Sequence, residues 1–280
     1  MATQEGLGMQ TRGEYVQAAP NVRLHVRDWG NGRPVVLIPG WPLSNDMYEY
    51  QMMDLVDHGY RPIALTLRGF GLSDKPYGPY NYDVFADDIK SVMDQLDLRE
   101  VTLCGHSMGA AIAIRYMSRH DGVRVANLAM FGPAAPLFTR RPDWPHGLQK
   151  ADVDKYIEAA RVDRSQMFTE FGKIFCRTEH SLSPGLNTWL YWLTMKASPL
   201  ATIECLKALR DTDLRPEVPK IRVPTLILHA ADDRICPYSF AESLAKSIKD
   251  AKLIRFDRSG HALFIEERRK FNDELLAFMG

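Results

Sequence analysis

Short apolar runs alternate with amphipathic segments along most of the chain. Residues 34–40 (PVVLIPG) and 62–67 (PIALTL) are continuously apolar, which is typical of strands that helices cover on both faces. Between them, residues 48–58 have the apolar spacing of a helix. Near the N-terminus, residues 14–19 and 22–30 predict an antiparallel hairpin. This alternation predicts an α/β fold with a mostly parallel, twisted sheet flanked by helices.

The alternation continues on both sides of a different middle section. Further strands are predicted at 100–106, 125–132, 225–232 and 252–257, and further helices at 82–98, 108–120, 238–249 and 266–279. Residues 133–219 contain no strand-like run and are rich in aromatic residues with helical spacing. We therefore expect an α/β core at 13–132 and 220–280. Residues 133–219 are predicted to form an inserted helical cap, and residues 1–12 a loose leader.

Composition and charge narrow the range of partners. The 280 residues are 45% hydrophobic and 25% charged, which is ordinary for a globular protein. Lysine plus arginine (35) equals aspartate plus glutamate (35), so no basic field favours nucleic acid or an anionic membrane surface. We expect neither of these partners, and the apolar runs are too short to span a membrane. Four scattered cysteines suggest free thiols and a cytoplasmic location; the oligomeric state stays open.

The sequence GHSMG at 105–109 places a serine between two glycines, after a predicted strand and before a predicted helix. This G-x-S-x-G pattern is typical of a nucleophile turn so sharp that only small residues fit beside the serine. The alternative is an ordinary strand-to-helix turn, which also favours glycine and serine. Ser107 is the candidate nucleophile, and it needs a base and an orienting acid elsewhere in the chain.

Residues suited to both roles follow later strands. Asp232 and Asp233 lie at the carboxyl end of the predicted strand at 225–232, and His261 follows the last predicted strand. Open α/β sheets bind their ligands at the carboxyl ends of the strands, where these side chains would meet. The chain order of serine, aspartate and histidine is also the order of the triad in α/β-hydrolases. The pattern itself leaves the choice between the two aspartates open.

Backbone N–H groups near the serine are expected to form an oxyanion hole. One would come from Met108, directly after the nucleophile, and the other from Trp41 in the loop after the first buried strand. Pro42 has no N–H to donate. His106 and His229 are predicted to be buried residues that do not act as the base. Since the sequence contains no phosphate-binding loop and no metal-ligand cluster, we expect no cofactor and no metal.

Several motifs together resemble the α/β-hydrolase superfamily, and within it the cofactor-free bacterial haloperoxidase/arylesterase-like group. The resemblance covers nearly the whole chain after about residue 14, and its motifs are GWPLS, LRGFGLSDKP, GHSMG, VPTLILHAADDRICP and SGH. It implies that Asp233 is the acid and that Trp41 supplies a backbone donor and walls the acyl pocket. Two positions depart from the family pattern, Pro39 in place of histidine and Ala230 in place of glycine.

The combined prediction is a serine hydrolase that cleaves small or aromatic carboxylic esters, or lactones, through an acyl-enzyme. The helical cap would cover the site, with Trp189 and Trp192 as candidate pocket walls. Two alternatives stay open. The same triad could serve perhydrolysis or a lyase reaction, since the Trp-Pro sequence occurs in relatives that make peracids. The fold could also belong to a non-catalytic ligand-binding or signalling protein.

Overall fold

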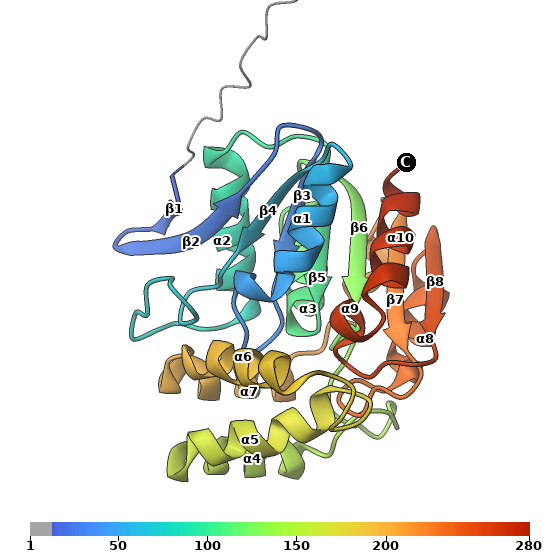
Figure 1. The fold of residues 1–280 in the computed structure, drawn as a ribbon. Helices are drawn as coiled ribbons and strands as arrows, with labels where there is room; N and C mark the ends of the chain where they lie inside the picture. The colour runs from blue at the N-terminus through green and yellow to red at the C-terminus, as the bar shows by residue number, and fades with distance from the viewer. Residues whose placement is uncertain (1–12) are drawn as a thin grey trace, which may run out of the picture.

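An eight-stranded sheet organises the computed structural model, which describes residues 13–280 (Figure 1). The predicted leader at 1–12 lies outside the described residues. The strands are β1 (Tyr15–Ala19), β2 (Val22–Asp28), β3 (Pro34–Ile38), β4 (Arg61–Leu65), β5 (Val101–His106), β6 (Val125–Phe131), β7 (Thr225–Ala230) and β8 (Ala251–Phe256). Their spatial order is β1-β2-β4-β3-β5-β6-β7-β8, and β3 to β8 are parallel. The predicted hairpin is confirmed as the antiparallel pair β1–β2.

Helices cover both faces of this sheet. The core helices are η1 (Asn45–Tyr48), α1 (Glu49–Asp57), α2 (Tyr82–Gln95), α3 (Met108–Arg119), η2 (Val218–Lys220), α8 (Tyr238–Ser247), α9 (Leu263–Glu266) and α10 (Arg268–Met279). Helices α1 and α10 contact each other on one face, whereas α2 packs against α3 on the opposite face (Figure 1). Strands β3 and β5 are buried along almost their whole length, as their unbroken apolar sequence predicts.

Between β6 and β7 the chain forms four helices, α4 (Lys150–Val162), α5 (Arg164–Phe175), α6 (Pro184–Met195) and α7 (Pro199–Asp211). We call these four helices the helical layer; they lie beyond the carboxyl ends of the parallel strands (Figure 1). Side chains of Asp163, Ser183 and Ser198 cap the N-termini of α5, α6 and α7 by accepting a backbone N–H. Proline follows both serine caps, where its fixed φ suits the first helical turn.

One difference from the predicted elements lies after β8. The helix expected at 266–279 begins at Arg268, and a separate short helix, α9, precedes it at Leu263–Glu266. Glu267, with φ −118° and ψ 43°, separates the two helices, and the side chain of the preceding Glu266 accepts the backbone N–H groups of Gly260 and Arg177. Across residues 13–280, no helix has both the length and the apolar character needed to cross a bilayer.

Candidate active site

Ser107 occupies the sharp turn between β5 and α3. Its backbone has φ 54° and ψ −118°, a left-handed conformation that is strained for a residue with a side chain. A Cβ atom on Gly105 would lie 2.4 Å from the carbonyl oxygen of Gly109, and one on Gly109 would lie 2.5 Å from that of Ile38. Glycine is therefore required on both flanks, and the turn projects Ser107 at the carboxyl end of the sheet.

Asp233 and His261 form a buried pair beside this turn. The two side chains are almost fully buried, and His261 Nδ1–H donates to Asp233 Oδ2 at 2.7 Å. The other carboxylate oxygen accepts the backbone N–H groups of Ile235 at 2.9 Å and Cys236 at 2.8 Å. Burial alone would raise the pKa of Asp233, but His261 and His229 outweigh it and hold this pKa well below its ordinary value. Asp233 is thus a carboxylate that orients an imidazole.

Several contacts place the His261 ring next to the serine turn. A Cβ atom on Gly132 would lie 3.2 Å from His261 Nδ1, and the Ser107 N–H donates to the carbonyl of the neighbouring Phe131 at 2.9 Å. Within residues 13–280, no hydrogen bond joins the Ser107 hydroxyl to the His261 imidazole. Such catalytic contacts are often long in ligand-free structures and tighten when substrate binds.

Two further histidines support this pair. His106 Nε2–H donates to the carbonyl oxygen of His261 at 2.9 Å, and the two rings lie 4.6 Å apart. Burial, and then the neighbouring His261, lower the pKa of His106 to about 3, so its imidazole is neutral at pH 7. His229 Nε2–H donates to the carbonyl of Cys236 at 2.7 Å and lies 3.5 Å from Asp233 Oδ2. Both residues are buried, as predicted, but sequence reasoning missed that they bond to the loops that carry His261 and Asp233.

The two predicted oxyanion donors lie on either side of Ser107. Met108 begins α3, and Trp41 follows Gly40 after β3. Gly40 allows this approach, because a Cβ there would lie 3.0 Å from the Ser107 Cβ. In the described part of the chain, the backbone N–H groups of Trp41 and Met108 have no hydrogen-bond acceptor.

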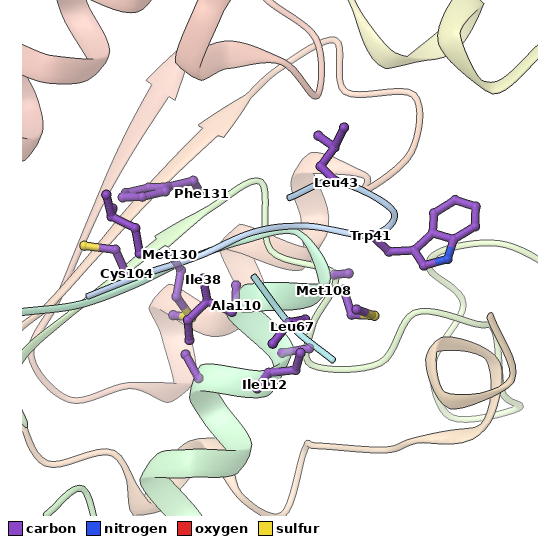
Figure 2. Close-up of a cluster of buried hydrophobic side chains, with 14 of the residues drawn as sticks. Ile38, Trp41, Leu43, Leu67, Cys104, Met108, Ala110, Ile112, Met130 and Phe131 are labelled. Carbon is purple, nitrogen blue, oxygen red and sulfur yellow. The ribbon is translucent and has the colours of Figure 1, made fainter. Parts of the chain in front are cut away.

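The Trp41 indole points away from the other side chains labelled in Figure 2 and toward the helical layer, where Phe168 and Phe171 pack on it. Its Nε1–H donates to the carbonyl of Thr202 in α7 at 3.2 Å. In the same loop the Leu43 N–H donates to the Gly40 carbonyl at 2.8 Å. These two hydrogen bonds hold the loop in which Pro39 departs from the family pattern.

Aromatic residues of α5 cover the site. Phe168 and Phe171 pack against the Trp41 ring at 5.9 and 5.3 Å, and Phe175 packs edge-on against the His261 ring at 5.6 Å. Their spacing of three and then four residues places them on one helix face. This spacing is a sequence signal that marks a shared helix face, but it does not show that the face covers the site.

The prediction for Trp189 and Trp192 is not supported. Trp192 is 61% exposed on α6, and neither tryptophan lines a cavity beside Ser107. The reason is helical geometry: α6 turns Leu190 and Thr194 inward, and Trp192 lies on a different side.

Two cavities lie between the helical layer and the core. The inner cavity, of about 50 Å³, is lined by Ser107 and Trp41 together with apolar residues of the layer, and by Arg234. The outer cavity, of about 390 Å³, lies between α5 and α6 and contacts Pro42 and Leu43. The inner lining is mostly apolar, whereas the outer one also carries threonine, asparagine, lysine and glutamate side chains.

The end of α5 is attached to the loops that carry Asp233 and His261. The Arg234 guanidinium donates to the carbonyls of Lys173 and Cys176 at 2.7 and 2.8 Å. The Ala262 N–H, next to His261, donates to the Phe175 carbonyl at 3.1 Å. The four cysteines are all buried and free. Residues 13–280 contain no group of three or more His, Cys, Asp or Glu side chains arranged to hold a metal.

Comparison with known proteins places this geometry in a family. Residues 33–268 match the model of the alpha/beta hydrolase fold family. The chain belongs to the α/β-hydrolase family. It is 46% identical over 266 residues to the AB hydrolase superfamily protein YisY of Bacillus subtilis, covering 95% of this chain and 98% of the relative. It is 32% identical to the non-heme chloroperoxidase CPO-A1 of Kitasatospora aureofaciens, with 92% and 96% covered.

A solved structure shows the same architecture. The esterase EaEST from Exiguobacterium antarcticum superposes with a TM-score of 0.93 at 43% identity, covering 95% of this chain and 99% of that one. The predicted fold class and the resemblance to the haloperoxidase/arylesterase-like group are therefore confirmed. Esterase and haloperoxidase relatives together support hydrolase activity for this chain.

Proposed function

We propose that this protein is a serine esterase acting on small carboxylic esters or lactones, with Ser107, His261 and Asp233 as its catalytic triad. The observation that carries the proposal is the buried 2.7 Å contact between His261 and Asp233 beside the strained turn at Ser107. A surface histidine or a structural turn would need neither the burial nor the strain, whereas both serve an activated nucleophile.

The reaction proceeds by two acyl transfers. His261 Nε2 takes the proton of the Ser107 hydroxyl as its oxygen attacks the ester carbonyl, and the C–O bond to the alcohol breaks as His261 returns that proton to the leaving oxygen. The Trp41 and Met108 N–H groups stabilise the oxyanion, helped by the N-terminus of α3. Water, deprotonated by His261, then attacks the acyl-enzyme and releases the acid. Asp233 keeps the His261 proton on Nδ1 and stabilises the imidazolium.

Perhydrolysis is the second candidate, and the non-heme chloroperoxidase relative favours it. In that reaction hydrogen peroxide replaces water in attacking the acyl-enzyme, so the product is a peracid rather than an acid. The two activities share every step up to the acyl-enzyme. Peroxide-dependent bromination of a dye in acetate buffer by the wild type, absent in Ser107→Ala, would support this candidate; its absence from the wild type would exclude it.

Hydrolysis of p-nitrophenyl acetate by the wild type and by Ser107→Ala tests the main proposal. We expect wild-type turnover and a loss of nearly all of it in the variant. The variant should unfold close to the wild-type temperature, because alanine keeps the Cβ atom of serine at this turn and removes only the hydroxyl. Activity retained in Ser107→Ala would refute the triad. Absence of turnover on any ester by the wild type, together with tight capture of a ligand, would favour a non-catalytic binding protein.

A further inference from the structure

Phe171 of α5 lines both cavities of the site. Its ring packs edge-on against Trp41 at 5.3 Å and lies 6.0 Å from the ring of Phe175. Trp41 lines the inner cavity, and Pro42, the next residue of the same loop, lines the outer one. The Phe171 side chain therefore lies next to the Trp41–Pro42 segment, at the boundary between the two cavities.

The two cavities differ greatly in size. A water molecule needs roughly 10–15 Å³ of such volume. The inner cavity, at about 50 Å³, therefore accepts roughly three to five groups of that size, which is room for a short acyl chain only. The outer cavity, at about 390 Å³, is nearly eight times as large and accepts an aromatic or long alkyl group. An ester with one short side and one bulky side fits this arrangement.

The chemistry of the triad assigns each side of the ester to a cavity. The leaving oxygen must receive a proton from His261, so the alcohol has to extend on the His261 side. Phe175, which packs against the His261 ring at 5.6 Å, lines the outer cavity and not the inner one. Ser107 lines the inner cavity, next to apolar side chains such as Val153 and Leu206. The acyl chain thus enters the inner cavity and the alcohol occupies the outer one.

We propose that Phe171 sets the substrate class of this enzyme, restricting it to esters of short acyl chains with bulky, aromatic or long-chain alcohols. This inference rests on the proposed esterase function. Phe171 acts by excluding long acyl chains, so its removal should join the two cavities. The outer cavity becomes no smaller in that variant, because Phe171 lines it as well, so the preference for bulky alcohols should persist.

Two substrate series test this proposal on the full chain. In the first, p-nitrophenyl esters keep the alcohol constant while the acyl chain grows from acetyl to butyryl and octanoyl. In the second, acetates of alkyl alcohols keep the acyl group constant while the alcohol grows from ethyl to 3-phenylpropyl. The wild type should show kcat/KM about tenfold or more lower for octanoyl than for acetyl, and higher for 3-phenylpropyl than for ethyl acetate.

Phe171→Ala should raise the octanoyl-to-acetyl ratio of kcat/KM about tenfold. Phe168→Ala is the matched control, because Phe168 lies on the same helix, also packs against Trp41 and lines only the outer cavity. It should leave the acyl ratio at the wild-type value. If thermal unfolding shows that Phe171→Ala does not fold, Phe171→Leu provides the same comparison with a smaller expected change.

The outcomes separate this inference from the proposed function. An active enzyme whose acyl ratio is the same in the wild type and in the folded Phe171 variant overturns the role of Phe171. A wild type that prefers octanoyl to acetyl esters, or is indifferent to the size of the alcohol, overturns the assignment of the cavities. Absence of Ser107-dependent turnover on both series overturns the proposed esterase and this inference with it.

Discussion

Replacing Asp233 by asparagine isolates the orienting role of its carboxylate. Both carboxylate oxygens are hydrogen-bond acceptors in the structure, Oδ1 from the backbone N–H groups of Ile235 and Cys236 and Oδ2 from His261 Nδ1–H. Asparagine has only one acceptor oxygen and an NH₂ donor. Because the two N–H groups select the amide oxygen, the NH₂ group faces His261 Nδ1 and favours the tautomer with the proton on Nε2.

This tautomer cannot accept the proton of Ser107, so the loss should appear in kcat. We expect Asp233→Asn to lower kcat about 10⁴-fold, as the loss of a correctly oriented base does in serine hydrolases, which corresponds to about 5 kcal/mol in the barrier. Binding of the ester depends on the two cavities rather than on Asp233, so KM should change little.

The assay compares kcat and KM for p-nitrophenyl acetate in the wild type, Asp233→Asn and Asp232→Asn. Asp232 is the matched control: its side chain is 52% exposed and forms an ion pair with Arg177 at 2.9 Å. Asp232→Asn should keep nearly full activity, because an exposed pair of this kind contributes little. Equal losses in the two variants, or a folded Asp233→Asn enzyme with wild-type kcat, would refute the assignment of the acid.

Two further predictions concern stability. Gly105→Ala should lower the free energy of unfolding by about 1–3 kcal/mol or more, because the new Cβ would lie 2.4 Å from a backbone oxygen. Gly185→Ala is the control and should have little effect, since the atom nearest to its Cβ would lie 3.9 Å away. Urea denaturation checks this, and similar losses would contradict it. Folding lowers the pKa of His106 from an ordinary 6.5 to about 3, so the unfolded chain binds a proton at a pH where the folded chain does not. The stability that the folded chain has with His106 neutral is therefore complete above pH 6.5 and is lost as the pH falls toward 3. The urea midpoint should therefore drop between pH 7 and pH 5, and less so in His106→Gln; equal drops would contradict the reasoning.

The core of the fold could be predicted from sequence because its signals are local. Continuous apolar runs mark the parallel strands, and the G-x-S-x-G turn lies where β5 meets α3, so Ser107 could be identified from five neighbouring residues. The choice between Asp232 and Asp233 was different, because both follow the same strand. Only the family resemblance favoured Asp233, and in the structure Asp233 is the carboxylate that meets the N–H groups of the next turn and the distant His261.

The pocket residues show a second limit of sequence reasoning. Residue type suggested Trp189 and Trp192, but the helix face decides which aromatic side chains reach the site. The face of α5 that carries Phe171 and Phe175 lies over Trp41 and His261, whereas Trp192 is exposed. The relation between these helices and the strand ends is a product of tertiary packing, so helical spacing could mark a shared face without showing what it covers.

Burial of the acid and base connects the helical layer to the chemistry. A carboxylate as buried as Asp233 is stable only when its charge is fully compensated, and three hydrogen bonds together with His229 supply that compensation. Exclusion of water also strengthens the interaction between Asp233 and His261. Phe175 contributes to this exclusion by packing on the His261 ring, and its carbonyl accepts the N–H of Ala262. The same end of α5 lines the outer cavity and packs on His261, so in the proposed esterase the fit of the ester would be coupled to the geometry of proton transfer.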